Sequence, residues 1–336
     1  MIVVTGGAGF IGANLVRKLN DRGFIDIVVV DNLEHSDKFR NLSDCQIRDY
    51  MDKNEFRDKV RSFHQFHDIE VIFHQGACSD TMESNGRYML DNNFTYSKEL
   101  FEYCRHTGVR FIYASSAAVY GVGQKFREVP GCEAPVNIYA YSKLLFDQYV
   151  RLNLPDVKSQ VVGLRYFNVY GEREQHKGRM ASVIYHFYRE FVTRGVVSLF
   201  EGSGGYDDGE QQRDFVFVED VAKVNLYFLD QPERSGIYNV GTGVAQSFND
   251  IAVAVIKGVR KYRGDTNLSL AELISEGMIE YVPFPPNLLD KYQSYTQADT
   301  SELKRAGYID TMSSAAQGVA RYIDCLWHSE STGSKN

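Results

Sequence analysis

Short apolar runs alternate with helical patterns through the first half of the chain. The runs are residues 2–4, 27–30, 71–74, 111–115 and 161–165. Several lack the polar alternation of a half-exposed strand, as expected where helices cover both faces of a parallel sheet. Between the first two runs, Ile11, Leu15 and Leu19 recur at one-turn spacing, and Gly23 follows as a helix stop. The pattern predicts repeated βα units in a doubly wound α/β sheet.

The pattern is less regular after about residue 167. A Gly/Asp-rich stretch lies at 202–209 and a polar, glycine-punctuated one at 258–277, while 214–218 and 237–240 again resemble strands. We therefore expect a large domain and a smaller, mixed α/β domain whose segments interleave along the chain. The expected large domain comprises residues 1–167, about 213–240 and 294–327; the smaller one comprises about 168–212 and 241–293; residues 328–336 are expected to be a disordered tail.

Composition and charge exclude several classes of protein. With 43% hydrophobic and 24% charged residues, the chain resembles a globular protein and not a disordered one. No apolar run reaches the 18 or so residues of a spanning helix, so we expect no membrane partner. The formal net charge of −7 is dispersed, which argues against binding nucleic acid. The five cysteines include no CxxC pair, and no charged leader precedes the first apolar run, so we expect a cytoplasmic protein without a structural metal.

A glycine-rich segment follows the first predicted strand. Residues 5–12 read Thr-Gly-Gly-Ala-Gly-Phe-Ile-Gly, which places Gly6, Gly9 and Gly12 three positions apart. A tight turn needs a positive φ at one position, a pyrophosphate needs close backbone approach at another, and helix packing excludes a side chain at the third. Because the next helix then begins at the phosphate, the segment predicts a dinucleotide site in a Rossmann-type domain.

The adenosine end of this site leaves the identity of the coenzyme open. Asp31 ends the second predicted strand, where a carboxylate accepts a hydrogen bond from a ribose hydroxyl, which favours NAD. Asn32 and the cations Lys38 and Lys53 are able to accommodate a ribose 2′-phosphate, which favours NADP.

Tyr139 and Lys143 form a Tyr-x-x-x-Lys pair that lies on one face of a predicted helix. A free phenol has a pKa near 10, and lowering it to about 7 requires roughly 4 kcal/mol, to which a lysine cation and an oxidised nicotinamide both contribute. Tyr141 lies two residues from Lys143 and is assigned to packing. Ser116 follows the run at 111–115, where open α/β sheets bind ligands, and can bond the reacting oxygen.

These segments together resemble the extended short-chain dehydrogenase/reductase family. The resemblance covers essentially the whole chain and includes the segments 73–77, 115–121, 165–171 and 213–218. The last two are similar to motifs of members that act on nucleotide sugars, so they imply Asn168 and Arg213 as ligands of a substrate diphosphate. The forked donors of an arginine suit phosphate oxygens.

A finer set of segments is similar to the members that epimerise an ADP-linked heptose. These segments are 31–33, 49–53, 75–79, 176–178, 180–183, 200–203 and 295–299. They imply NADP as coenzyme, ADP-heptose as substrate, epimerisation at C6 for lipopolysaccharide precursors, and a homo-oligomer that is pentameric. Two features depart from the pattern, because Arg179 stands where the resemblance places a serine and the stretch 204–212 is longer than usual.

The resemblance also implies the residues of the site. The implied cofactor-binding residues are Gly6, Gly9, Phe10, Ile11, Gly12, Asp31, Asn32, Lys38, Lys53, Gln75, Gly76, Ala77, Cys78, Ser79, Asn92, Lys143, Val169 and Lys177. The implied substrate-binding residues are Ser116, Asn168, Arg179, His186, Phe200, Glu201, Gly202, Ser203, Arg213 and Tyr292. Tyr139, Lys177, Lys143 and Ser116 form the expected catalytic set.

Such an epimerase needs two proton carriers. It would remove a hydride from a carbinol carbon and return it to the opposite face, so the substrate oxygen moves to another side of the pocket. One tyrosine cannot serve both orientations, and Lys177 is a suitable second group if burial lowers its pKa. His176 is the neighbouring alternative, but adjacent side chains generally diverge.

Two other interpretations remain open. The first is a different nucleotide-sugar enzyme, such as a UDP-sugar 4-epimerase or a 4,6-dehydratase. A dehydratase needs an extra acid to eliminate water, and residues 115–117 do not contain the Thr-Asp-Glu that would supply it. The second is a non-catalytic NADP-binding sensor, which would have lost the pair Tyr139 and Lys143.

Overall fold

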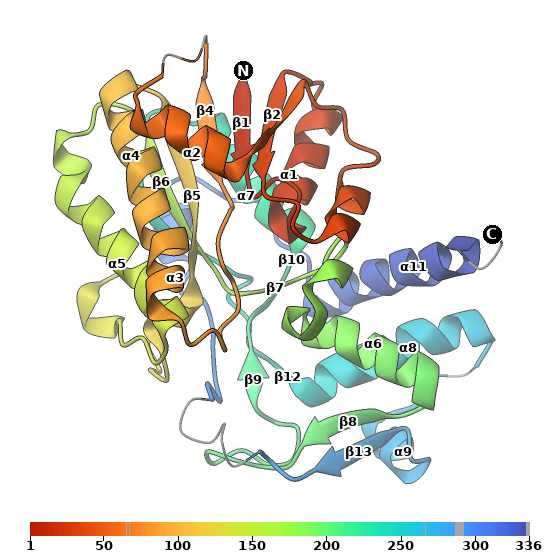
Figure 1. Cartoon of the computed structure of the whole chain (residues 1–336). Coiled ribbons are helices and arrows are strands. Elements are labelled where there is room, and N and C mark those ends of the chain that lie inside the picture. Colours follow the sequence, from red (N-terminus) through yellow and green to blue (C-terminus); the bar gives the residue numbers. More distant parts are fainter. Residues whose placement is uncertain (65, 67, 266, 286–291, 334–336) are drawn as a thin grey trace.

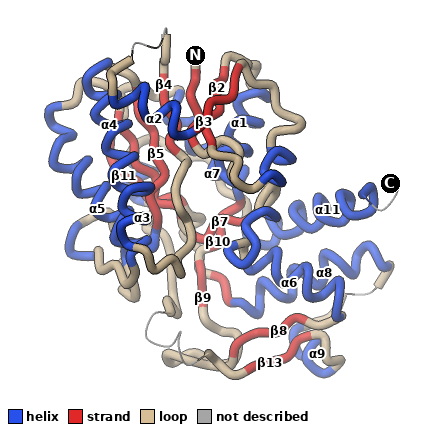
Figure 2. The backbone as a smooth tube through the Cα atoms, viewed as in Figure 1, coloured by secondary structure: helices blue, strands red, loops and turns tan. Residues whose placement is uncertain are grey.

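A seven-stranded parallel sheet forms the centre of the larger part of the molecule (Figures 1 and 2). The computed structural model describes residues 1–64, 66, 68–265, 267–285 and 292–333. In sheet order the strands are β11 (Gly236–Val240), β6 (Val161–Tyr166), β5 (Arg110–Ser116), β4 (Val71–His74), β1 (Ile2–Thr5), β2 (Ile27–Asp31) and β3 (Asp49–Asp52). Counted from the other edge, the strands β3, β2, β1, β4, β5 and β6 have the order of a Rossmann fold. This order confirms the predicted fold class.

Helices cover both faces of this sheet because successive strand residues point to opposite sides. Val4 and Val29 pack with α1 (Phe10–Asp21), α7 (Val218–Leu229) and α10 (Ser301–Arg305). Val3 and Val28 pack with α2 (Lys53–Arg61), α4 (Tyr96–Thr107) and α5 (Ile138–Asn153). Both faces are therefore buried, which explains why the strand segments are continuously apolar.

The second part of the molecule is smaller and mixed. It contains three two-stranded units: β7 (Asn168–Tyr170) with β10 (Phe215–Phe217), β8 (Val197–Phe200) with β13 (Ile279–Val282), and β9 (Gln212–Arg213) with β12 (Gln246–Ser247). Its helices are α6 (Val183–Arg194), α8 (Phe248–Arg263), α9 (Leu270–Ser275) and α11 (Ala315–Gly333), and they share an apolar core with β7, β8, β10 and β13 (Figure 1). The expected domain boundaries stay a prediction, and residues 286–291 of the smaller domain lie outside the described residues.

Shorter helical turns connect these elements. They are η1 (Ser36–Asn41), α3 (Gly86–Leu90), η2 (Asp91–Thr95), η3 (Ala117–Tyr120), η4 (Pro130–Cys132), η5 (Leu154–Asp156) and η6 (Gln175–Met180). Two of them matter for the site, because η1 carries Lys38 and η6 carries Lys177.

The expected disordered tail is helical over most of its length. Helix α11 continues to Gly333, and only residues 334–336 lie outside the described residues. The carboxylate of Glu330 accepts hydrogen bonds from the Tyr188 hydroxyl at 3.0 Å and from Arg189 at 2.8 Å. These contacts with α6 hold the end of the helix, and the small polar residues of this segment gave no indication of them.

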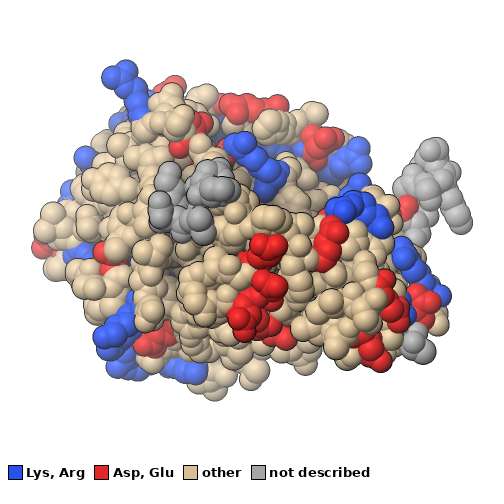
Figure 3. Space-filling model, turned by 90° about the horizontal axis from the view of Figure 1, so that it is seen from below, with Lys and Arg blue, Asp and Glu red and all other residues tan. Residues whose placement is uncertain are grey.

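Charges on the surface are mixed. On the face shown in Figure 3, acidic and basic side chains are interspersed among other residues, as the dispersed sequence charge predicts. Within the described ranges, no helix combines the length and the apolar character needed to cross a membrane.

Candidate active site

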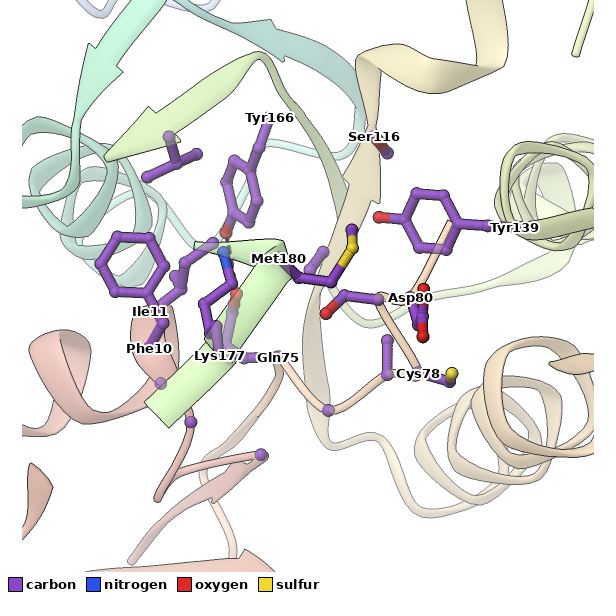
Figure 4. Close-up of a pocket in the computed structure, with 18 of the residues that line it drawn as sticks. Phe10, Ile11, Gln75, Cys78, Asp80, Ser116, Tyr139, Tyr166, Lys177 and Met180 are labelled. Carbon is purple, nitrogen blue, oxygen red and sulfur yellow. Dashed lines mark hydrogen bonds between the residues drawn. The ribbon is translucent and has the colours of Figure 1, made fainter. Parts of the chain in front are cut away.

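A cavity of about 730 Å³ opens at the carboxyl ends of β1, β4, β5 and β6. In doubly wound sheets this edge, where the strand order reverses between β1 and β4, is where ligands bind. Every implied cofactor residue and all four implied catalytic residues line the cavity. Figure 4 labels Ser116, Tyr139 and Lys177 of the catalytic set. The fold therefore gathers side chains that are far apart in the sequence around one space.

The glycine turn between β1 and α1 lines the cavity with Gly6, Gly9 and Gly12. Gly6 has φ +65°, and a Cβ at this position would lie 2.5 Å from the backbone of Gly76. A Cβ on Gly12 would lie 2.2 Å from the carbonyl oxygen of Gly6. Gly9 precedes α1, whose first turn has no side-chain cap and no acidic residue. The free N–H groups of this helix start suit a phosphate, so the turn fits the pyrophosphate of a dinucleotide.

Polar side chains define the adenosine end. The Asp31 carboxylate accepts hydrogen bonds from the Ala8 N–H at 3.0 Å and from the Lys38 ammonium. Lys53 donates to the amide oxygen of Asn92 at 3.0 Å. The adenosine end thus has two ammonium groups, those of Lys38 and Lys53, and one carboxylate, that of Asp31, in the cavity lining.

Helix α5 carries the tyrosine and lysine pair. Burial raises the pKa of the Tyr139 phenol, and a hydrogen bond with Ser116 offsets part of this effect. Lys143 donates from Nζ to the carbonyl oxygen of Ala114 at 2.9 Å. Burial lowers the pKa of Lys143 to about 8, against the opposing charge of Asp147. Burial of the phenol thus outweighs the groups of the chain that would lower its pKa. The lowering expected from Lys143 together with an oxidised nicotinamide stays a prediction.

Lys177 lies across the cavity from Tyr139. In Figure 4 the two side chains enter from opposite sides, with Met180 between them. The Lys177 ammonium lies 5.0 Å from the centre of the Phe10 ring. Burial lowers its pKa, and the charge of Glu174 partly opposes this shift. The cavity therefore has an ionisable side chain on each side, and a role of these two groups in proton transfer stays a prediction.

Arg213 reaches the cavity from the smaller part of the molecule. It is 6% exposed, and its guanidinium lies 4.7 Å from the Tyr292 ring and 5.6 Å from the Phe248 ring. In the described part of the chain no carboxylate pairs with it. A buried cation without an acidic partner suits an anionic ligand, and Asn168 lines the same cavity.

The remaining implied substrate residues lie outside the cavity lining. They are His186, Phe200, Glu201, Gly202, Ser203 and Tyr292. Tyr292 adjoins the cavity through Arg213, and Phe284 connects its ring to that of Phe200. His186 is exposed on α6, and the structure does not bring it to the other site residues. Their roles in substrate binding stay predictions.

Arg179 lies at the cavity with an acidic partner. Its guanidinium donates to the Asp80 carboxylate at 2.6 Å, which joins η6 to the loop after β4. The side chain is exposed, so the pair contributes little to stability.

The sequence reasoning missed Tyr166, Asp80 and Met180, which also line the cavity. The Tyr166 hydroxyl donates to the amide oxygen of Gln75 at 3.1 Å. Its position as the last residue of β6, at the carboxyl edge of the sheet, was the signal that could have identified it.

A doubly wound sheet with this cavity defines a dinucleotide-dependent enzyme. The chain belongs to the NAD dependent epimerase/dehydratase family, whose model matches residues 2–241. Its coenzyme is accordingly a nicotinamide dinucleotide, and the glycine turn fits one.

Among individual relatives, the chain is 56% identical over 327 residues to ADP-L-glycero-D-manno-heptose-6-epimerase of Thiobacillus denitrificans (strain ATCC 25259 / T1), covering 97% of this chain and 98% of the other. The crystal structure of ADP-L-glycero-D-manno-heptose-6-epimerase of Helicobacter pylori has a TM-score of 0.81 at 30% identity, covering 97% and 96% of the two chains. The UDP-glucose 4-epimerase of Thermus thermophilus, solved with NAD, has a TM-score of 0.75 at 28% identity, covering 96% and 97%. The resemblance to heptose epimerases found in the sequence is confirmed by the first two relatives.

Proposed function

We propose that this protein is an isomerase that converts ADP-D-glycero-D-manno-heptose to ADP-L-glycero-D-manno-heptose at C6, for lipopolysaccharide inner-core precursors. The 56% identity to a heptose epimerase supports the substrate. The observation that carries the chemistry is the position of Tyr139 and Lys177 on opposite sides of one cavity (Figure 4).

The bound coenzyme would supply a hydride acceptor that later returns the hydride to the same carbon. Tyr139 takes the proton of the substrate hydroxyl in one orientation, and Ser116 holds the same oxygen by a hydrogen bond. Lys143 contributes a cation beneath the phenol. After the carbonyl has turned over, its oxygen lies toward Lys177, which gives or takes the proton there. Burial favours this role, because it lowers the lysine pKa toward neutrality.

The substrate diphosphate binds Arg213 and Asn168 in this proposal. The buried guanidinium supplies charge-assisted hydrogen bonds, and the rings of Tyr292 and Phe248 hold its plane. The segment 200–203 completes the substrate site from the smaller domain, since Phe284 lies between the rings of Phe200 and Tyr292. A contact of His186 with substrate rests on the resemblance alone.

We propose NADP rather than NAD as the coenzyme. Lys38 and Lys53 place two ammonium groups at the adenosine end, and Asp31 already accepts a hydrogen bond from one of them. The carboxylate is therefore less available to a ribose hydroxyl, while a 2′-phosphate gains two cationic partners.

The proposal extends to assembly and location. We propose a cytoplasmic homo-oligomer, a pentamer by resemblance. In it residues 1–167, about 213–240 and 294–327 form the NADP-binding domain and about 168–212 and 241–293 the substrate-binding domain, although β10 and α11 pack in the core of the smaller part.

The test uses purified protein without added coenzyme. It is incubated with ADP-D-glycero-D-manno-heptose and, separately, with UDP-galactose, and the epimers are separated by anion-exchange chromatography. Epimerisation of the heptose supports the proposal, whereas turnover of UDP-galactose alone would assign a 4-epimerase. No turnover of either sugar would favour a non-catalytic sensor. Mass spectrometry of the nucleotide released on denaturation identifies the coenzyme.

A further inference from the structure

The loop that carries Lys177 is held by side chains of the dinucleotide-binding elements. Asn14 of α1 donates from its amide to the Glu172 carbonyl oxygen at 2.9 Å. The Arg173 guanidinium donates to the carbonyl oxygen of Asn41 and to both oxygens of Asp44, the latter at 2.8 Å each. These contacts fix the residues just before Lys177 on α1 and on the segment that follows β2.

Asn41 is the residue at which three parts of the site meet. Its side-chain amide donates to the Ala8 carbonyl oxygen at 2.9 Å, inside the glycine turn. The same amide nitrogen lies 3.1 Å from Nδ1 of His176, the residue before Lys177. Asn41 also ends η1, the turn that carries Lys38, and it is 7% exposed. One buried amide thus touches the phosphate-binding turn, the adenosine-side turn and the Lys177 loop.

The other side of the loop is fixed as well. Glu174 is fully buried, and its carboxylate accepts hydrogen bonds from Ser182 at 2.5 Å and 2.7 Å and from the Gly171 N–H at 3.2 Å. The Lys177 N–H donates to the Glu174 carbonyl oxygen at 2.9 Å. This side of the loop is therefore bonded within the loop and to the start of α6, while Asn41 bonds the residue before Lys177 to the glycine turn.

We propose that Asn41 is a positioning residue for Lys177, which it holds at the reacting carbon by joining the Lys177 loop to the glycine turn and to η1. This inference rests on the proposed function, because it assumes that Lys177 transfers a proton. The arrangement ties the second proton carrier to the elements that bind the coenzyme.

Asn41→Ala tests this role, and Asn20→Ala is its matched control. The Asn20 amide donates to the carbonyl oxygens of Phe24 and Gln46, both at 2.8 Å, and accepts from the Gln46 N–H at 2.7 Å, so the control removes three side-chain bonds to neighbouring segments. With saturating NADP and ADP-heptose, we expect kcat of Asn41→Ala to fall roughly tenfold to a hundredfold with little change in KM, since a displacement of about 1 Å has an effect of this size. Asn20→Ala should keep the kcat of the unmodified chain.

A double variant separates positioning from general damage. In a Lys177→Met background the ammonium is absent, so adding Asn41→Ala should leave the residual kcat within about twofold, because effects transmitted through one group are not additive. An equal loss in both backgrounds, or a kcat of Asn41→Ala equal to that of Asn20→Ala, would overturn the inference.

Two further measurements complete the design. If Asn41→Ala is too unstable to purify, Asp44→Asn loosens the Arg173 contact from an exposed position and should lower kcat in the same direction, again only when Lys177 is present. An unmodified chain that does not epimerise ADP-heptose would overturn the proposed function and the inference together. An active chain with normal Asn41 and Asp44 variants would overturn the inference alone.

Discussion

The ammonium of Lys143 donates a hydrogen bond to the carbonyl oxygen of Ala114, 2.9 Å away, at the carboxyl end of β5. The lysine is 5% exposed, and burial lowers its pKa from 10.5 to about 8. It is thus fixed one turn below Tyr139 on α5, where its position and its charge state both depend on the sheet.

This pKa predicts how the stability of the protein depends on pH. Below about pH 8 the folded chain bears the full cost of burying the charged lysine, whereas between about pH 8 and 10.5 the unfolded chain binds more protons than the folded one. The free energy of unfolding, relative to that of Lys143→Met, should therefore rise with pH across this window. Urea unfolding of both proteins at pH 7 and pH 9.5 measures the difference. A difference that falls with pH contradicts the assignment.

Tyr139→Phe should reduce kcat by roughly 100- to 10,000-fold, because it removes a general acid and base while keeping the ring. The protein should still retain its coenzyme, which absorbance of the denatured sample measures. Tyr141→Phe is the control on the same helix, since that side chain is 44% exposed, and its kcat should not change. Turnover of Tyr139→Phe near that of the control excludes the assigned role.

Lys177→Met should reduce epimerisation by a similar factor, because one orientation of the substrate oxygen loses its proton carrier. The half-reaction that Tyr139 serves, in which the hydroxyl proton goes to Tyr139 and the hydride goes to the bound NADP to leave a ketone, should persist in a single turnover, and the absorbance of the reduced coenzyme measures it. Lys158→Met changes an exposed lysine away from the cavity and serves as control. If both activities of Lys177→Met equal those of the control, the second carrier is a different group.

Lys38→Ala should shift the coenzyme content from NADP toward NAD. The change removes a charge-assisted bond to a 2′-phosphate, worth about 1.5–3 kcal/mol, and frees Asp31 to accept from a ribose hydroxyl. The ratio of NADP to NAD, measured by mass spectrometry after denaturation, should fall tenfold or more. Lys125→Ala, at an exposed position, should keep the ratio. An unchanged ratio in Lys38→Ala would show that the ammonium does not contact the coenzyme.

Gly12→Ala should prevent coenzyme binding and lower the thermal midpoint, since the added Cβ would lie 2.2 Å from the carbonyl oxygen of Gly6. Gly131→Ala adds a Cβ with no heavy atom within 4 Å, so its midpoint should remain close to that of the unmodified chain. Coenzyme content and thermal unfolding of the two variants test the close packing of α1 against the turn. Equal behaviour of the two variants would contradict it.

Sequence alone predicted most of the large sheet, for physical reasons. Continuous apolar runs indicated strands buried on both faces, and residues 5–12 combined a strand end, a glycine turn and a helix start. The edge strand β3 was not predicted, because it begins at Asp49 and ends at Asp52 and its side chains are at most partly buried. Strands β9 and β12, which pair with each other, are too short to show a periodic pattern of apolar residues.

The site also has features that the sequence predicted and features that only the packed structure shows. The spacing of Tyr139 and Lys143 fixed their common helix face, and the glycines fixed the turn, because both depend only on neighbouring residues. Other features depend on contacts between distant segments. These are the lining of the cavity by Tyr166, the contact of Glu330 with α6 and the contact of Asn41 with His176. Only the packed fold decides which of these side chains meet and how far burial moves their pKa values, because sequence spacing carries no information about long-range packing.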